Sequence, residues 1–312
     1  MHIVRSLEDY RADAELLLSI GVFDGVHSGH RAVLAKLVSQ RAPGRIAGAL
    51  TFVQHPQEFL HPGQGPKALT TVDEKVNLLD ACGLDVLFLL PFDERIQQLS
   101  PEAFLNDILI ARLRVKTLVV GEGWRFGKDR AGDVALARAV LESRQRAVET
   151  ADLLASDGVR VSSSHIRDLI EGRDFTSADR LLGSPYTVRG SVIGGDGRGH
   201  TLGFPTANLS IAPEKLVPPA GVYGGIARHD GQELVAVVSI GDKPTFDGAR
   251  VVVEAYLLDF DRSIYGEQLA LHGWSFVREQ QRYPNAAALV QQMNLDVERV
   301  RLHAQASPAG RG

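Results

Sequence analysis

Two histidines placed three residues apart are the part of this chain best suited to chemistry. They lie in Gly21-Val-Phe-Asp-Gly-Val-His-Ser-Gly-His30, between an apolar run and a helical pattern, which predicts a strand, a glycine-bearing turn and a helix N-terminus. Free N–H groups and the helix dipole favour a phosphate there, and imidazoles can donate to it as charge builds during transfer. The motif predicts nucleotidyl transfer by His27 and His30, and a polar helix cap is its alternative interpretation.

A second cluster, Thr51-Phe-Val-Gln-His-Pro56, follows the next strand candidate. Phe52 could stack on a flat ring, while a strand end with a satisfied histidine explains the same residues equally well.

A third cluster, Val161-Ser-Ser-Ser-His-Ile-Arg167, opens a short helix. Its serine hydroxyls and helix N-terminus could hold a triphosphate, and Arg167 could stabilise a departing pyrophosphate. A serine run before a helix is otherwise an ordinary N-cap.

A glycine-rich arch in the second half, Gly194 to Asn208, reads Gly-Gly-Asp-Gly-Arg-Gly-His-Thr-Leu-Gly-Phe-Pro-Thr-Ala-Asn. Such an arch lets the backbone approach phosphates closely, although it is not a Walker A sequence. Thr206 and Asn208 alternate along a strand, so their oxygens face the same way and suit the Mg²⁺ carried by ATP. Without its Phe-Pro-Thr-Ala-Asn ending, the stretch would be read as a flexible hairpin.

One carboxylate stands in an otherwise apolar strand, Val253-Glu-Ala-Tyr-Leu-Leu-Asp-Phe260. Facing a ligand, Glu254 could deprotonate a primary hydroxyl; on an exposed strand it would be an ordinary solvated charge. The residues alone leave both open.

The elements that must position these residues form two different patterns. The first half alternates strands with helices, which predicts a parallel, doubly wound sheet whose ligands bind at the carboxyl ends of the strands. The expected strands are 16–21, 46–53, 86–90 and 117–120, and the expected helices are 30–40, 73–81, 101–113 and 134–143.

After about Gly183, short β-rich runs punctuated by Gly and Pro predict an antiparallel barrel closed by a C-terminal helix over 284–304. The boundary is placed at Ser184-Pro185, which predicts domains 1–184 and 185–304 and a flexible tail 305–312. The expected barrel strands are 187–193, 221–228, 234–240, 251–259 and 268–271, with Thr206 and Asn208 on a further strand.

Composition limits the classes of protein. The chain has 312 residues, enough for two domains, and a net charge of −4, which argues against a general nucleic-acid binder. Its single cysteine excludes an intrachain disulfide and fits a reducing compartment. Neither a signal peptide nor a membrane-spanning apolar run is seen, so we expect a cytoplasmic protein.

Taken together, the first-half motifs resemble the His-x-Gly-His nucleotidyltransferases, and more narrowly the N-terminal module of prokaryotic bifunctional riboflavin kinase/FAD synthetases. Gly121-Glu-Gly-Trp-Arg-Phe-Gly127 and Arg130-Ala-Gly-Asp133 match further motifs of that module. The resemblance implies that FMN and ATP bind here and give FAD and pyrophosphate. It assigns ATP to Gly21, Phe23, Asp24, Gly29, Ser162 and Ser163, and the flavin to Phe52, His55, Pro56, Trp124, Arg125 and Phe126.

The second half resembles the riboflavin kinase module over essentially its whole length. Gly221-Val-Tyr223, Ser239-Ile-Gly-Asp-Lys-Pro-Thr-Phe246 and Ile264-Tyr-Gly266 follow in the family's order. The resemblance implies that Glu254 is the base on the ribityl hydroxyl, that Arg278 lies near the flavin, and that Mg-ATP is held by Thr206, Asn208, Gly195, Gly197 and Gly199.

The two resemblances predict a bifunctional enzyme that converts riboflavin to FMN and then FMN to FAD, with homo-oligomerisation left open. Gly123-Trp124 stands where the family has Asn or Asp and then Phe, and Ser239 replaces a common Asn. Three alternatives remain: a kinase whose transferase half is degraded, a flavin-binding regulator without turnover, and transfer to another phosphate-bearing acceptor.

Overall fold

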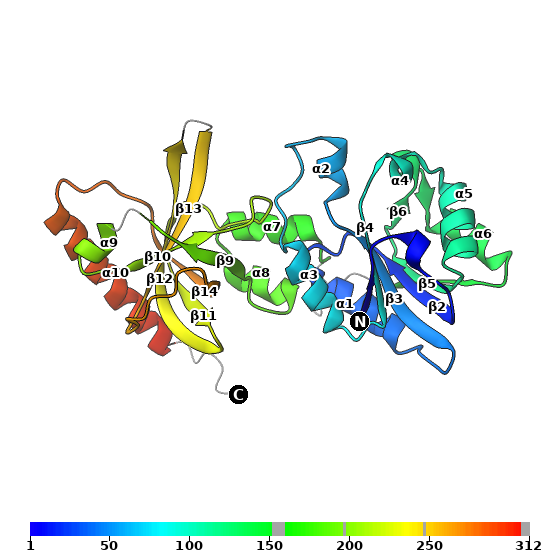
Figure 1. Cartoon of the computed structure of the whole chain (residues 1–312), viewed down its shortest axis with the longest axis horizontal. Coiled ribbons are helices and arrows are strands. Elements are labelled where there is room, and N and C mark those ends of the chain that lie inside the picture. Colours follow the sequence, from blue (N-terminus) through cyan, green and yellow to red (C-terminus); the bar gives the residue numbers. More distant parts are fainter. Residues whose placement is uncertain (152–159, 196–197, 246–247, 307–312) are drawn as a thin grey trace. The chain divides into compact units, whose positions relative to one another are not determined.

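The computed structural model describes residues 1–151, 160–195, 198–245 and 248–306. Contacts divide the chain into two compact units, Met1–His165 and Ile166–Gly312, which are coloured blue to green and green to red in Figure 1.

The N-terminal unit is built on a parallel six-stranded sheet with the order β1-β4-β3-β2-β5-β8. Its central strands are continuous apolar runs because they are buried on both faces, as parallel strands usually are. The strands are β1 (His2–Val4), β2 (Glu15–Ile20), β3 (Arg45–Phe52), β4 (Val86–Leu90), β5 (Val115–Gly121) and β8 (Ala147–Ala151), and a separate hairpin joins β6 (Arg125–Phe126) to β7 (Gly132–Asp133).

Side chains at the helix ends explain where these helices begin. Thr71 and Glu74 form a capping box at the start of one helix, and Ser100 caps another that has proline in its first turn. The helices are α1 (Ser28–Val38), α2 (Pro56–Leu60), α3 (Val72–Asp80), α4 (Glu94–Gln98), α5 (Pro101–Ala103) and α6 (Val134–Glu142).

The doubly wound parallel sheet is confirmed, with two corrections to its elements. The single α-helix expected over 101–113 is wrong: after α5 the chain forms a π-helix, η3 (Phe104–Arg112), in which Leu113 N–H bonds Ile108 O five residues back. Apolar spacing indicates a helix without deciding which carbonyl closes each turn. The edge strands β1 and β8 were missed because one is very short and the other mixes polar with small residues.

The order of the strands brings the polar segments predicted after β2, β3 and β5 to the same edge of the sheet. From β2 the chain moves to β3 and then β4 on one side, and it later returns to β5 on the other side of β2. A doubly wound sheet opens a crevice at such a switch point, beyond the carboxyl ends of its strands. The segments that follow β2, β3 and β5 are therefore neighbours at this edge.

The antiparallel barrel that the sequence predicts is confirmed in the C-terminal unit. It is closed, and its strand order is β10-β13-β12-β11-β14-β9. Closure leaves no free sheet edge. Its elements are α7 (Ser163–Glu171, which begins just before the division), α8 (Phe175–Leu182), β9 (Val188–Ile193), α9 (Arg198–Thr201), β10 (Thr206–Ser210), β11 (Gly221–His229), β12 (Gln232–Thr245), β13 (Gly248–Leu257), β14 (Gln268–Arg278) and α10 (Ala286–Ala306).

Alternation along the strands separates the barrel interior from its outer face. Val253 and Ala255 of β13 are buried in the core, whereas Glu254 between them points to the other face. Helix α10 packs on that outer face, where a Cβ at Gly224 of β11 would lie 2.9 Å from Val300 Cγ2. Glycine at 224 therefore lets the helix approach the barrel closely.

The contacts group α8 and most of α7 with the barrel. Phe175 of α8 packs edge-on against Tyr223 of β11, with ring centroids 5.9 Å apart, and lies near Trp274 of β14. The expected boundary at Ser184-Pro185 lies after these two helices and stays a prediction. Of the expected tail 305–312, residues 307–312 lie outside the described residues, and α10 continues to Ala306.

Asp179 of α8 supports a pH-dependent stability prediction. Its carboxylate accepts a hydrogen bond from Tyr186 N–H, and burial raises its pKa to about 6. Because this pKa is above its unfolded value, stability falls as the pH rises from about 4 through 6. We expect Asp179→Asn, whose amide oxygen can still accept that bond, to raise the free energy of unfolding by about 1–3 kcal/mol at pH 7.5. Chemical denaturation should show the gain vanish near pH 4; a gain equal at both pH values would contradict the assignment.

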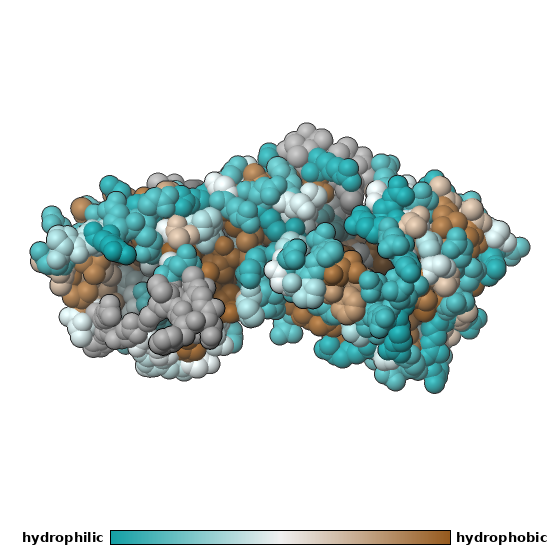
Figure 2. Space-filling view, turned by 90° about the horizontal axis from the view of Figure 1, so that it is seen from above, coloured by the Kyte–Doolittle hydropathy of each residue, from teal (hydrophilic) through white to brown (hydrophobic). Residues whose placement is uncertain are grey.

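The surface is mostly polar on the face drawn in Figure 2, where hydrophobic residues are broken up by hydrophilic ones. Among the described residues, no helix is long and apolar enough to cross a membrane.

Candidate functional site

The turn after β2 carries backbone strain. Phe23 and Val26 adopt left-handed conformations, with φ of 51° and 40°, which is uncommon for residues with large side chains. Strain of this kind persists only where the surroundings hold it, and it is frequent at functional sites. Phe23 is buried and lies edge-on to the His30 ring, with centroids 5.1 Å apart.

Asp24 fastens this turn to the rest of the unit. Its buried carboxylate accepts hydrogen bonds from the backbone N–H groups of Leu69 and Thr70, both at 3.1 Å. Its backbone carbonyl accepts a 2.9 Å bond from the Ser163 hydroxyl. Two predicted clusters that are about 140 residues apart in the sequence are thus brought together. Ser162 accepts from His165 N–H at the start of α7, so it acts as the N-cap that the sequence allowed.

The two imidazoles form one stacked unit. Their ring centroids are 3.6 Å apart and the rings are nearly parallel, at 15°. His27 Nδ1 accepts the His30 N–H at 3.3 Å and caps α1, so in neutral His27 the proton is on Nε2. His30 Nδ1 is buried and makes no hydrogen bond with any residue that the structure describes. Gly29 between them is buried in the first turn of α1.

Burial keeps both rings neutral near pH 7. It lowers the pKa of His27 to about 4, against the opposing effect of Asp24, and it lowers the pKa of His30, helped by His27. Each neutral ring carries one N–H donor that a phosphate oxygen could accept.

The end of β3 contributes the second cluster. His55 caps α2 by accepting Gln57 N–H at its Nδ1, and Pro56 begins the helix, which fits the structural alternative for this motif. Phe52 lies edge-on to Phe92 at 5.1 Å and is half-buried, so its aromatic face is shared with the protein.

A residue that sequence reasoning missed joins the ends of β2 and β3. Lys75 of α3 is buried, and its ammonium donates to Phe52 O at 2.7 Å and to Val22 O at 3.4 Å. Burial lowers the pKa of Lys75 to about 8, and Asp24 opposes that shift. Its place on the helix that begins at the Thr71 capping box was the only signal in the sequence.

The end of β5 positions an aromatic pair. Trp124 stacks on Phe126, with centroids 4.2 Å apart, while Phe126 itself is buried in the core and Gly132 lies directly against its ring. Arg125 is exposed and pairs with Asp133 at 3.4 Å. Of this group, Trp124 is therefore the residue with an aromatic face partly outside the core.

The departure at Gly123 has a neighbour that the sequence did not reveal. A Cβ there would lie 3.1 Å from Arg160 Nη2, so the guanidinium occupies the space beside the glycine. Gly21 lies beside the Phe23 ring and donates its N–H to Leu50 O. Arg167 is buried in α7 and is grouped with the second unit, and its role in transfer stays a prediction.

On the barrel, two glycines of the arch pack against Thr206 and Asn208, the predicted oxygen ligands. A Cβ at Gly195 would lie 2.1 Å from Asn208 Nδ2, and one at Gly199 would lie 3.2 Å from Thr206 Oγ1 and 2.3 Å from Phe204 O. Only glycine permits so close an approach. Gly197 lies outside the described residues.

Strand register then aligns three polar residues. Asn208 of β10 is directly opposite Glu254 of β13, which is directly opposite Ser239 of β12. Residues paired in this way project from the same face, and their Cβ atoms are about 5 Å apart. All three are half-buried on the outer face of the barrel. We call Asn208, Glu254 and Ser239 the polar row.

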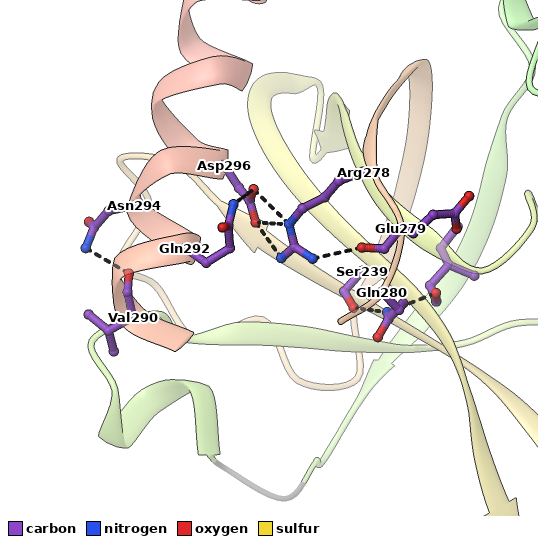
Figure 3. A network of polar contacts seen from close by, with 9 residues as sticks. Ser239, Arg278, Glu279, Gln280, Val290, Gln292, Asn294 and Asp296 are labelled. Carbon is purple, nitrogen blue, oxygen red and sulfur yellow. Dashed lines mark hydrogen bonds and ion pairs between the residues drawn. The ribbon is translucent and has the colours of Figure 1, made fainter. Parts of the chain in front are cut away.

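Arg278 closes this region from β14. Its guanidinium makes a two-pronged ion pair with Asp296 of α10, with donor–acceptor distances of 2.7–3.0 Å, and also donates to Glu279 O (Figure 3). Gln292 donates to the same carboxylate. Most donors of Arg278 are therefore engaged by the protein, and contact with a flavin stays a prediction.

This ion pair is a strong stability determinant. Asp296 is 2% exposed and the Arg278 side chain 14% exposed, so removing one partner leaves a nearly buried charge. We expect Asp296→Ala to lower the free energy of unfolding by about 3–5 kcal/mol. Thermal denaturation measures this loss, with the exposed pair Arg301–Asp259 as the control: Arg301→Ala should cost at most about 1 kcal/mol. Equal losses of stability in the two variants would contradict the conclusion that the buried ion pair anchors α10 to the barrel.

Two sites of this kind, one on a doubly wound sheet and one on a closed barrel, define a two-domain nucleotide-dependent transferase. The FAD synthetase family matches residues 10–165, and the riboflavin kinase family matches residues 182–303. The chain belongs to the bifunctional riboflavin kinase/FMN adenylyltransferase family.

Relatives match over nearly their whole length. Proteins named bifunctional riboflavin kinase/FMN adenylyltransferase are 34% identical in Listeria monocytogenes (94% of each chain) and 35% identical in Pseudomonas fluorescens (96% of this chain, 97% of the other). The Escherichia coli K12 protein of that name is 34% identical over 90% of each chain. A Streptococcus pneumoniae structure described as a macrolide-efflux protein superposes with a TM-score of 0.84 and 27% identity, covering 96% of this chain and 98% of that one.

Proposed function

We propose that this protein phosphorylates riboflavin to FMN with ATP on its barrel, and then joins FMN to AMP from a second ATP on its N-terminal sheet. The observation that carries the proposal is the coexistence of the stacked histidines and the polar row in one chain of this family. Both reactions are displacements at phosphorus, so positioning and charge stabilisation supply most of the catalysis.

In the transferase reaction, an FMN phosphate oxygen attacks the α-phosphorus of ATP, and pyrophosphate leaves. The neutral N–H donors of His27 and His30 stabilise the charge that develops on the transferring phosphate. Ser163 and Asp24 hold the turn that presents those donors. We assign to Arg167 the stabilisation of the departing pyrophosphate. Trp124 offers the partly exposed aromatic face for the flavin.

In the kinase reaction, the primary hydroxyl of riboflavin attacks the γ-phosphorus of ATP, its proton passes to the Glu254 carboxylate, and ADP leaves. The neutral oxygens of Thr206 and Asn208, with the glycine arch packed against them, fit an ATP-borne Mg²⁺, which would neutralise phosphate charge there. Enzymes of these two classes use a divalent metal, and Mg²⁺ is the ion that this donor set favours.

The main alternative is a kinase-only protein. It is favoured by Gly123, because the family carries a polar side chain at that position. It is opposed by the Arg160 guanidinium, because this polar group lies in the space beside the glycine. We also propose that the protein is located in the cytoplasm, where ATP is available. Whether the protein forms a homo-oligomer stays open, and sedimentation of the purified protein would decide it.

Product analysis tests the function directly. The purified protein is incubated with ATP and Mg²⁺, with either riboflavin or FMN, and the products are separated by chromatography. FMN and FAD from riboflavin, together with FAD from FMN, are expected. FMN that never becomes FAD would establish the kinase-only alternative, and no product from either mixture would contradict the proposal.

A further inference from the structure

Gln280, just beyond the end of β14, contacts the polar row through its amide group. Its Nε2 donates to Ser239 Oγ at 2.9 Å and to Ile240 O at 3.0 Å (Figure 3). Both amide hydrogens are therefore used on β12. Gly241 leaves room for this contact, because a Cβ there would lie 3.1 Å from Gln280 Nε2.

Gln280 is an exposed residue, and the two residues before it are anchored by ion pairs. Arg278 is fixed by Asp296 of α10, and Glu279 pairs with Arg173 at 2.6 Å, while Arg173 also donates to Ala220 O. The two charged residues that precede Gln280 are thus already paired within the barrel unit. Its neutral amide is the group that this anchored segment presents to Ser239.

The bond from Gln280 determines what the serine hydroxyl can do. A hydroxyl has one hydrogen to donate and two lone pairs to accept with. Since one lone pair receives the Gln280 hydrogen, the O–H is directed away from Gln280. Glu254 is the cross-strand partner of Ser239, and side chains paired in this way project from the same face with Cβ atoms about 5 Å apart.

We propose that Gln280 is a positioning residue for riboflavin phosphorylation, which orients the Ser239 hydroxyl so that it donates to the Glu254 carboxylate. The inference rests on the proposed role of Glu254 as the base. A hydrogen bond donated to a carboxylate favours its charged form and fixes its orientation. The base is then held ionised with its other oxygen available for the proton of the riboflavin hydroxyl.

The test measures FMN formation against pH for the full-length protein and for Gln280→Ala, Ser239→Ala and the double variant. We expect each single variant to lower kcat about tenfold with little change in KM for ATP, and to move the acidic limb of the profile upward. The double variant should lose no more than either single one, because both remove the same interaction. Ser239→Thr, which keeps the hydroxyl, should retain most of the rate.

Two controls distinguish the loss of a positioning contact from a folding defect. FAD formation from supplied FMN by the same preparations should be unchanged, and the exposed neighbour variant Gln281→Ala should behave as wild type. A Gln280→Ala protein with normal kcat and pH profile, or losses in the two single variants that multiply in the double one, would overturn the inference. Full turnover by Glu254→Gln would instead overturn the proposed function, which is a distinct result.

Discussion

Replacing Glu254 by glutamine should reduce FMN formation about 10²- to 10⁴-fold. The amide has nearly the same shape as the carboxylate but cannot accept the hydroxyl proton as a base. Because Glu254 is in the middle of β13 between Asn208 and Ser239, the isosteric change should leave the strand register intact. The loss should therefore appear in kcat.

The measurement is the initial rate of FMN formation from riboflavin under saturating ATP and Mg²⁺. Glu298→Gln, on the exposed side of α10, is the matched control and should keep the wild-type rate. FAD formation from supplied FMN should be unaffected in both variants. Undiminished FMN formation by Glu254→Gln would remove this residue from the role of base.

Replacing His30 by alanine should reduce FAD formation about 10²- to 10³-fold while riboflavin phosphorylation continues. His30 is stacked on His27, and its Nδ1 makes no hydrogen bond within the described part of the chain. A buried polar nitrogen in this state has the capacity to bond a ligand or a water molecule. The variant removes that group without removing the His27 cap of α1.

The readout is the ratio of FAD to FMN when the variant is supplied with riboflavin and excess ATP. FMN should accumulate, since the barrel reaction does not use this residue. His2→Ala, which changes an exposed histidine on β1, should give the wild-type ratio. If the His30→Ala protein made FAD at the normal rate, transfer would have to depend on another group.

Local pattern was sufficient for the architecture of both halves. Buried apolar runs alternating with capped helices imply a parallel sheet, and short punctuated strands imply a barrel, because each pattern can bury its apolar surface in few ways. The His27–His30 and Thr206–Asn208 pairs were likewise found from the sequence, since their members lie within one turn or one strand. The π-helix at 104–112 was not, because apolar spacing does not specify which carbonyl each N–H bonds.

By itself, then, the sequence determined the two fold classes, the family and the residues that could carry the chemistry. Only the tertiary structure decided which of those residues are available to bind a ligand and which are engaged in holding the fold together. The bond from the buried Lys75 to Phe52, the bond from Ser163 to Asp24, and the contact of Gln280 with Ser239 each join segments more than 20 residues apart. Such contacts depend on the strand register, on the order of strands in the sheet and on how deeply each side chain is buried. These are properties of the folded chain, and no local pattern of residue types encodes them.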